Sequence, residues 1–263
     1  MTDIEQAAEV LAETALSGGR IVAFTGAGIS QESGIPTFRG ADGIWQRYDP
    51  EAVATYEGFV ADPALCWRFH EALRDICRQA KPNTAHLALT WIDAATGVRS
   101  PVPVITQNID GLHQAAGSSH VLELHGSCHR MRCTECEFIT DEMPEQFDAL
   151  PPTCECGALL RPDVVWFGEQ LPRDAMAEAE RLAEAARVML VVGTSATVQP
   201  AASLPVIALR SGATLIEANF EPTPLTAMAE VSLQGPAGAT LPALAEAVGA
   251  RLNGSRADDE HAR

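Results

Sequence analysis

The sequence is poor in basic side chains. Lysine and arginine together number 18, against 35 aspartates and glutamates, and the formal net charge is −17. Because a phosphate backbone is bound chiefly through lysine and arginine, this balance argues against free nucleic acid as a partner. An acidic surface would attract basic protein tails, although acidity by itself mostly reflects solvation.

Long apolar runs are missing as well. No stretch approaches the roughly 20 apolar residues that a membrane-spanning helix needs. The first residues, MTDIEQAAEVLAETA, are acidic and amphipathic, and they lack the basic segment and apolar block of a signal peptide. We therefore expect a cytoplasmic protein with no membrane partner. Hydrophobic residues still make up 46% of the 263, which is enough for a substantial core.

Short apolar runs alternate with helical patterns along most of the chain. The runs that indicate buried strands are 20–25, 102–106, 121–124, 164–167, 188–192 and 213–217. The main helical patterns are 4–17, 63–78, 83–92, 173–186, 202–210 and 241–252. This alternation predicts an α/β fold, a Rossmann-like parallel sheet with helices on both faces and a ligand at the carboxyl edge of its strands.

Two stretches interrupt the alternation. Residues 41–95 are predicted to be a helical insert, and residues 128–161, rich in cysteine and proline, a small zinc-ribbon insert. The Rossmann-like part would then be assembled from residues 1–40, 96–127 and 162–252. The polar last residues, 253–263, are expected to be disordered.

A glycine loop follows the first predicted strand, in VAFTGAGISQESGIPTFRG (22–40). Gly26 and Gly28 would let backbone N–H groups approach a pyrophosphate, but Gln31 stands where a dinucleotide fingerprint has its third glycine. A lone Gly-x-Gly pair is often only a tight turn. The position directly after a strand and several nearby hydroxyls favour a ligand site.

The missing third glycine has a structural consequence. Without it a following helix cannot pack closely on the strand, so we expect residues 30–45 to form a loop over the ligand. Arg39 would be a phosphate or ribose contact. Phe38 is either an apolar lid over the ligand or a plain core aromatic.

Four of the seven cysteines form a cluster, and an odd count with such a cluster favours a metal site over disulfides. Four thiolates suit a tetrahedral zinc ion and leave no position open for a catalytic water, so one structural zinc is predicted. The second knuckle is one residue shorter than usual, which leaves Cys128 or His129 as a possible substitute ligand. The predicted ligands are Cys133, Cys136, Cys154 and Cys156.

Polar side chains follow two neighbouring predicted strands. TQNIDGLH (106–113) follows one, and His125 follows the next. Since imidazole titrates near neutrality, His125 is a candidate general base. A histidine at a strand end is more often structural, but beside QNID and GAGIS the catalytic interpretation is favoured. No serine or cysteine with an adjacent base stands out as a nucleophile.

Together these motifs resemble one family. GAGISQESGIPTFRG, TQNIDGLH, LHG (124–126), the four cysteines, VVWFGE (164–169), GTS (193–195) and Asn219 occur in this order. Over roughly residues 20–250 the chain resembles the sirtuins, NAD-dependent protein deacylases, of bacterial type. The resemblance implies a Rossmann-like domain and a zinc-bearing small domain, with NAD and an acyl-lysine of a protein or peptide meeting in the cleft between them.

The resemblance also implies roles for individual residues. His125 would deprotonate a ribose hydroxyl, Asn108 would orient the ribose and a water, and Asp110 would hold the nicotinamide carboxamide. The acylated peptide would add as a strand along Val164, Val165, Trp166, Phe167, Gly168 and Glu169. The residues implied for NAD binding are Gly26, Ala27, Gly28, Ile29, Ser30, Phe38, Arg39, Trp45, Gln107, Asn108, Ile109, Asp110, Gly193, Thr194, Ser195, Asn219, Glu221 and Ala237.

The preferred acyl group is predicted from one helix. VVWFGE resembles the bacterial branch that often removes succinyl or malonyl groups with a Tyr-x-x-Arg pair, in which the arginine binds the acyl carboxylate. In WRFHEALRD (67–75), His70 stands at the tyrosine position and Leu73 at the arginine position. Arg74 is one residue away, about 100° around the helix. We therefore expect neutral acyl groups, acetyl or longer, with His70 and Leu73 lining their pocket.

Three other functions remain open at this point. One is a desuccinylase or demalonylase, and another is a mono-ADP-ribosyltransferase, in which a protein side chain attacks the same bound NAD. The third is a zinc-ribbon binding module without catalytic activity.

Overall fold

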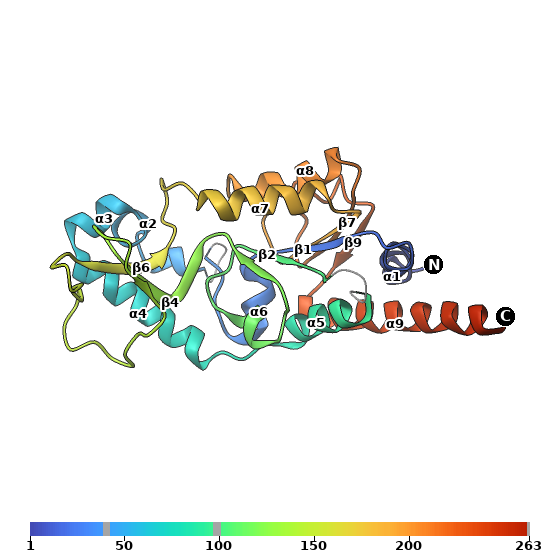
Figure 1. Ribbon diagram of the computed structural model, residues 1–263, viewed down its shortest axis with the longest axis horizontal. Coiled ribbons are helices and arrows are strands. Elements are labelled where there is room, and N and C mark those ends of the chain that lie inside the picture. Colours follow the sequence, from blue (N-terminus) through green and yellow to red (C-terminus); the bar gives the residue numbers. More distant parts are fainter. Residues whose placement is uncertain (39–42, 97–100, 262–263) are drawn as a thin grey trace.

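The computed structural model describes residues 1–38, 43–96 and 101–261, with the side chains of 255–261 left aside. A six-stranded parallel sheet forms the centre of its larger unit, in the order β3-β2-β1-β7-β8-β9 (Figure 1). The chain moves outward from β1 in one direction and then from β7 in the other. In such a doubly wound sheet, a crevice opens at the carboxyl ends where the direction reverses. The strands are β1 Ile21–Thr25, β2 Val104–Thr106, β3 Val121–Glu123, β7 Val188–Val192, β8 Thr214–Asn219 and β9 Val231–Gln234.

Helices cover both faces of this sheet, which confirms the predicted fold class (Figure 1). On one face lie α1 (Asp3–Leu16), α5 (Thr84–Thr96) and α9 (Ala237–His261). On the other lie α7 (Arg173–Glu184) and α8 (Leu204–Arg210). Because successive strand residues point to opposite faces, Ile21 and Ala23 of β1 belong to one core and Val22 and Phe24 to the other.

Local signals account for the helix starts. Thr2 and Glu5 form a reciprocal capping box at the start of α1. The Asp62 side chain accepts from the Leu65 N–H at the start of α4 (Pro63–Gln79), where Pro63 takes the first helical position. These caps stabilise backbone N–H groups that would otherwise lack partners.

A second, smaller unit packs beside the sheet. It contains α2 (Pro50–Val53), α3 (Tyr56–Ala61) and α4, with an antiparallel sheet in the order β5-β4-β6. These strands are β4 Gly126–Cys133, β5 Ile139–Thr140 and β6 Leu160–Val164. The helices and strands share one core around Trp67, Phe69 and Trp166, so the two predicted inserts pack together. The exact division of the chain into domains stays a prediction.

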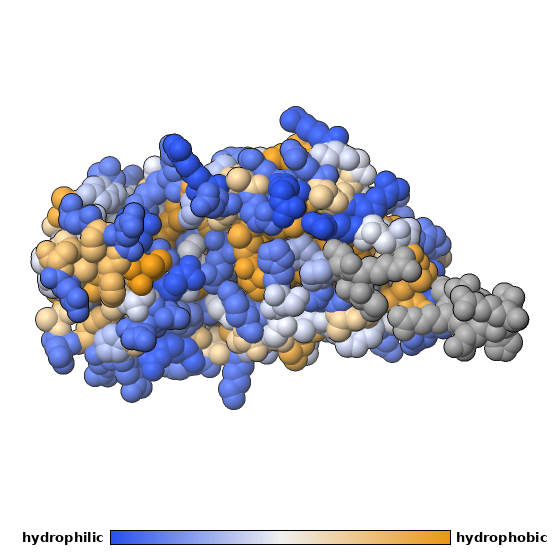
Figure 2. Space-filling model, in the orientation of Figure 1, coloured by the Kyte–Doolittle hydropathy of each residue, from blue (hydrophilic) through white to orange (hydrophobic). Residues whose placement is uncertain are grey.

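The visible face is mostly hydrophilic, with patches of hydrophobic side chains over the small unit and over the centre of the molecule (Figure 2). Exposed apolar side chains of this unit include Val60, Phe138 and Ile139. No helix in the described part of the chain combines the length and the apolar character needed to cross a membrane.

Two predicted elements differ from the structure: the loop expected from residue 30 and the strand expected at residues 164–167. A 3₁₀ helix, Ala27–Ser33, follows β1 directly, where a loop was expected from residue 30. It ends at Gly34, which has φ +87°, and Pro36 then disfavours further helix. The strand expected at 164–167 lies earlier, at Leu160–Val164, because the Trp166 N–H bonds to the Glu169 side chain instead of a ladder partner.

The C-terminus also differs from expectation. Helix α9 runs to His261, so the disorder expected for 253–263 is wrong through that residue, and 262–263 lie outside the described residues. Residues 253–261 contain no proline, and they extend a helix whose earlier turns pack against α1 and α5. Figure 1 shows α9 projecting at the same end of the molecule as the N-terminus.

Candidate active site

One large cleft, about 910 Å³ in volume, lies at the carboxyl edge of the six-stranded sheet. Its other wall belongs to the small unit and to the segment after β6. The segments that follow all six strands contribute to the lining, through Gly26, Gln107, His125, Gly193, Phe220 and Ala237. The sheet therefore brings together side chains that are distant in the sequence.

The glycine loop packs closely on the loop that follows β7. The Gly28 N–H donates to the Gly193 carbonyl at 2.7 Å, and a Cβ on Gly28 would lie 2.7 Å from that oxygen. A Cβ on Gly26 would lie 2.8 Å from Thr194 Cβ. Gly193 itself has φ +60°, in the left-handed region. The glycines thus allow two loops of the protein to touch, in addition to any approach by a ligand.

A buried polar layer lies directly behind the cleft lining. The Ser30 hydroxyl donates to Asp110 Oδ2 at 2.7 Å and accepts from Asn108 Nδ2 at 3.1 Å. Burial raises the pKa of Asp110. His86 Nε2 lies 3.4 Å from the same hydroxyl. This layer fixes the side-chain orientation of Asn108, which does line the cleft.

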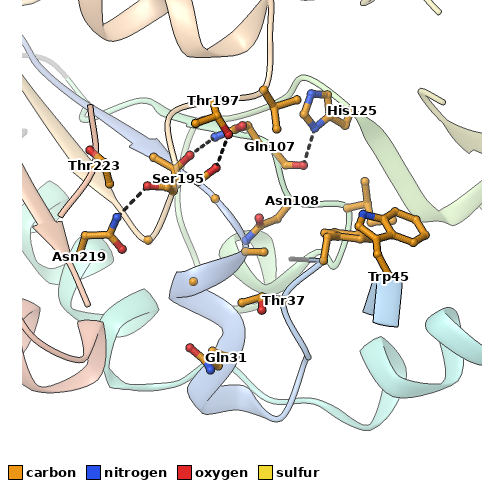
Figure 3. Close-up of a pocket in the computed structure, with 18 of the residues that line it drawn as sticks. Gln31, Thr37, Trp45, Gln107, Asn108, His125, Ser195, Thr197, Asn219 and Thr223 are labelled. Carbon is orange, nitrogen blue, oxygen red and sulfur yellow. Dashed lines mark hydrogen bonds between the residues drawn. The ribbon is translucent and has the colours of Figure 1, made fainter. Parts of the chain in front are cut away.

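His125 has its ring held from one side. Its Nδ1 lies 2.9 Å from the Gln107 carbonyl oxygen, shown as a dashed line in Figure 3. A carbonyl can only accept, so Nδ1 carries the proton and Nε2 is the basic nitrogen of the neutral ring. Burial lowers the pKa of His125, partly offset by this hydrogen bond. His125 is therefore neutral and able to accept a proton near pH 7.

Hydrogen bonds among loop residues shape the opposite end of the cleft. Asn219 Nδ2 donates to the Thr194 carbonyl at 2.7 Å, and Gln107 Nε2 donates to Thr194 Oγ1 at 2.9 Å. In Figure 3, Gln107 and Asn108 lie between His125 and Trp45 on one side and Ser195 and Asn219 on the other. The buried Glu217 carboxylate accepts from Thr223 and other hydroxyls, which anchors the loop after β8.

The small-unit end of the cleft is apolar and aromatic. Trp45 packs between Phe38 and Phe69, with ring centroids 5.4 and 5.8 Å away. His70 is buried, and its burial lowers its pKa to about 4. Its Nδ1 lies 2.9 Å from the Cys66 carbonyl oxygen, and its Nε2 accepts from the Trp166 indole N–H at 3.2 Å. His70 therefore adds no charge to this end.

Arg74 and Arg161, two arginines of the described residues that lie near this end, are both engaged by carboxylates. Arg74 is buried and bonds to Glu71 and to the Pro144 and Glu145 carbonyls, and it is not among the residues that line the cleft. Arg161 lies under Trp166 and is paired with Glu169.

Four cysteine sulfurs at the far end of β4 lie within 4.8 Å of one another. Sulfurs bound tetrahedrally to zinc at about 2.3 Å lie about 3.8 Å apart, so the cluster fits a zinc ion. The Glu135 and Cys136 N–H groups point at Cys133 Sγ and lower its pKa to about 6. His129 is engaged elsewhere, with its Nε2 3.0 Å from the Asp110 carbonyl. The clustered ligands are those predicted: Cys133, Cys136, Cys154 and Cys156.

Comparison with known proteins settles the family. The family model described as "Sir2 family" matches residues 26–200, about two thirds of the chain. The chain belongs to the Sir2 family. The matched residues run from the glycine loop to the end of the loop after β7.

Curated Sir2 relatives match almost the whole chain. NAD-dependent protein deacylase 2 of Pyrobaculum aerophilum is 50% identical over 245 residues, covering 92% of this chain and 96% of its own. NAD-dependent protein deacylase 1 of Caldanaerobacter subterraneus is 48% identical over 229 residues, covering 86% and 93%.

Solved Sir2 structures match the fold closely. A Sir2 homologue in complex with ADP-ribose has a TM-score of 0.88 at 43% identity, covering 96% of this chain and 98% of that chain. A Sir2–p53 peptide–NAD⁺ complex has a TM-score of 0.76 at 37% identity, covering 88% and 94%.

Most residues expected for NAD in this Sir2 protein line the cleft. Ile29, Ser30 and Asp110 do not, and lie buried behind it. Arg39 falls outside the described residues. The expected residues that line it are Gly26, Ala27, Gly28, Phe38, Trp45, Gln107, Asn108, Ile109, Gly193, Thr194, Ser195, Asn219, Glu221 and Ala237. All the residues expected for the substrate line it too: His70, Leu73, Val164, Val165, Trp166, Phe167, Gly168 and Glu169.

The structure adds lining residues that sequence reasoning missed. Phe69 neighbours His70 on α4, and its helical position relative to Leu73 would have revealed it. Thr197–Pro200 continue the GTS loop, and Pro222–Pro224 continue the segment after Asn219. Gly235 and Pro236 follow β9, a short edge strand whose pattern VSLQ gives little apolar signal.

Proposed function

We propose that this Sir2 protein is an NAD-dependent protein-lysine deacylase acting on neutral acyl groups. The observation that carries the proposal is His125, a neutral imidazole whose basic Nε2 belongs to a cleft lined by the ends of all six parallel strands. The names of the relatives and the ADP-ribose and peptide–NAD⁺ complexes of similar structures support it.

NAD would bind as a co-substrate along the carboxyl edge of the sheet. Backbone groups of the glycine loop at Gly26–Gly28 would hold the pyrophosphate. Thr194, Ser195 and Asn219 would hold the adenosine half, with Glu221 and Ala237 at its edge. Asn108, fixed by Ser30, would orient the nicotinamide ribose, and Asp110 would act from behind the lining on the carboxamide.

The reaction follows from this placement. The acyl oxygen of the lysine amide attacks C1′ of the ribose, and nicotinamide leaves with the bonding electrons. His125 then takes the proton of a ribose hydroxyl, which attacks the resulting imidate carbon. The tetrahedral carbon then expels the lysine amine with cleavage of its C–N bond, and water adds to the cyclic acyl cation that remains on the ribose. The products are nicotinamide, free lysine and O-acyl-ADP-ribose.

The small-unit end of the cleft would receive the acyl chain. An acyl carboxylate would need a cation to pair with, because a buried unpaired charge is costly. Among the described residues of this end, Leu73 is apolar, His70 is neutral, and Arg74 and Arg161 are engaged by carboxylates. Acetyl or longer neutral chains are therefore favoured over succinyl and malonyl.

The peptide would pair with the segment that follows β6. Backbone bonds hold this segment from the protein side, from the Val165 N–H to the His125 carbonyl at 3.0 Å and from the Phe167 N–H to the Ala54 carbonyl at 2.9 Å. An added strand would use its other edge. Seven unpaired cysteines fit a reducing compartment, and we propose a cytoplasmic location.

The test incubates the zinc-loaded protein with NAD and acetyl-, butyryl- and succinyl-lysine peptides. We expect nicotinamide release and peptide mass loss, with acetyl or butyryl exceeding succinyl by at least tenfold. His125→Ala should lower the rate by roughly 100-fold or more. His120→Ala, a histidine outside the cleft, is the matched control. Radiolabel from NAD retained on protein would favour ADP-ribosyl transfer, and absence of both products would refute the proposal.

A further inference from the structure

Trp166 lies at the acyl end of the cleft and is held on several sides by the protein. The residue is 3% exposed, and its indole N–H donates to His70 Nε2 at 3.2 Å. Its backbone N–H donates to Glu169 Oε2 at 2.8 Å. Phe59 packs against the ring, with centroids 5.2 Å apart. Trp166 is also one of the residues that line the cleft.

A buried cation stacks on the same ring. The Arg161 guanidinium carbon lies 3.4 Å from the centroid of the indole, and Arg161 is only 3% exposed. A guanidinium over an aromatic face is attracted to the ring electrons, most strongly where water is excluded. Arginine also presents a flat face that a lysine ammonium lacks.

Glu169 fixes the plane of this guanidinium. Arg161 Nη1 and Nη2 donate to its two carboxylate oxygens at 2.5 and 2.8 Å, and Nη2 also donates to the Val164 carbonyl at 3.0 Å. Burial alone would raise the pKa of Glu169, but these bonds and the Trp166 N–H lower it. Arg161 Nε has no partner among the described residues, so stacking and the carboxylate set its orientation.

From this geometry we propose that Arg161 is a positioning residue that sets the acyl-chain selectivity of the cleft by stacking on the face of Trp166, whose indole N–H is held by His70. The inference rests on the proposed deacylase function. Arg161 touches the indole and is not among the residues that line the cleft. Its effect should therefore appear in the choice between acyl chains and not in the use of NAD.

The experiment compares Arg161→Lys and Arg161→Met with the unmodified protein on acetyl- and hexanoyl-lysine versions of one peptide. The readout is the ratio of kcat/KM for the two peptides. Because the same sample acts on both, partial unfolding cancels from the ratio. We expect the hexanoyl-to-acetyl ratio to rise at least fivefold in both variants, because the released indole can yield to a longer chain. The KM for NAD should stay within twofold.

Two further variants complete the design. His70→Leu removes the hydrogen bond to the indole N–H and leaves the Arg161–Glu169 ion pair in place, so it should shift the ratio in the same direction. Arg130→Met removes a cation of the same small sheet that pairs with Glu123 and Asp163, and it should leave the ratio unchanged.

Several outcomes would overturn the inference. One is an unchanged ratio in both Arg161 variants while they remain active. Another is an unchanged ratio in Arg161→Lys together with a shifted ratio in Arg161→Met. A positive charge would then be enough to hold Trp166, and the flat guanidinium would not be needed. If Arg161→Met does not fold, Arg161→Lys and His70→Leu decide. An unmodified protein that releases no nicotinamide would instead refute the deacylase function itself.

Discussion

At the scale of single residues, the protonation of His125 controls the proposed chemistry. Burial lowers its pKa below the ordinary 6.5, so the ring is already neutral at pH 7. We expect kcat/KM to be constant at pH 7 and above. It should fall only below about pH 6.5, as the His125 ring takes up a proton. A pH profile on the acetyl peptide measures this. A half-maximal rate at or above pH 7 would contradict it.

Gly28 gives a second prediction at this scale. A Cβ there would lie 2.7 Å from the Gly193 carbonyl oxygen, which is backbone and cannot move aside cheaply. Gly28→Ala should lower the free energy of unfolding by about 1–3 kcal/mol and weaken NAD binding. Urea unfolding and the KM for NAD measure the two effects. Gly254→Ala is the control, because open space in a helix makes it neutral or stabilising.

At the scale of elements, β4 connects the zinc cluster to the active site. It begins at Gly126, next to His125, and ends at the ligand Cys133. On the way, the Cys128 N–H donates to the Ile109 carbonyl at 2.9 Å, and His129 bonds to the Asp110 carbonyl. Chelating the metal should therefore lower both deacylase activity, by tenfold or more, and the melting temperature. Zinc should restore both, and full activity of the metal-free protein would contradict the connection.

Elements were predictable from sequence where one pattern dominated. Val188–Val192 is buried on both faces, and its apolar run predicted its bounds. The strand predicted for VVWFGE was wrong in its bounds. Its apolar and partly β-branched residues are typical of a strand, but the Trp166 N–H donates to the Glu169 side chain instead of to a neighbouring strand. The motif residues were found because they follow strands. The buried support of Asn108 by Ser30, and of Trp166 by Arg161, depends on contacts between segments far apart in the chain, and no local pattern carries them.

At the scale of the whole molecule, buried neutral histidines predict acid sensitivity. Burial lowers the pKa of His70 and His86 to about 4 and that of His113 to about 3. Below pH 6.5 the unfolded chain binds protons that the folded chain does not, so the free energy of unfolding falls with pH. Each of these histidines lowers the free energy of unfolding by about 1.4 kcal/mol for every pH unit below 6.5, until the pH reaches the pKa of that histidine in the folded protein. Urea unfolding between pH 7.5 and pH 5 checks this, and equal stability across that range would contradict it.

The net charge of −17 gives a prediction about substrates. A peptide with lysine or arginine beside its acyl-lysine should be processed faster than one with acidic neighbours, by about tenfold at low salt. The advantage should shrink as salt is added, because screening shortens the reach of the charges. Rates for the two peptides across a salt series measure it. A difference that persists unchanged at high salt would point to direct contacts instead.

The small unit is built from two insertions, and the apolar side of each is covered by the other. The Trp67 indole on α4 donates to the Leu160 carbonyl on β6 at 2.8 Å, and both residues belong to one core. Deleting either insertion would expose the buried side of its counterpart to water. An engineer who wished to graft a different peptide-recognition module onto this sheet would therefore have to exchange both loops of the chain at once, as a matched pair.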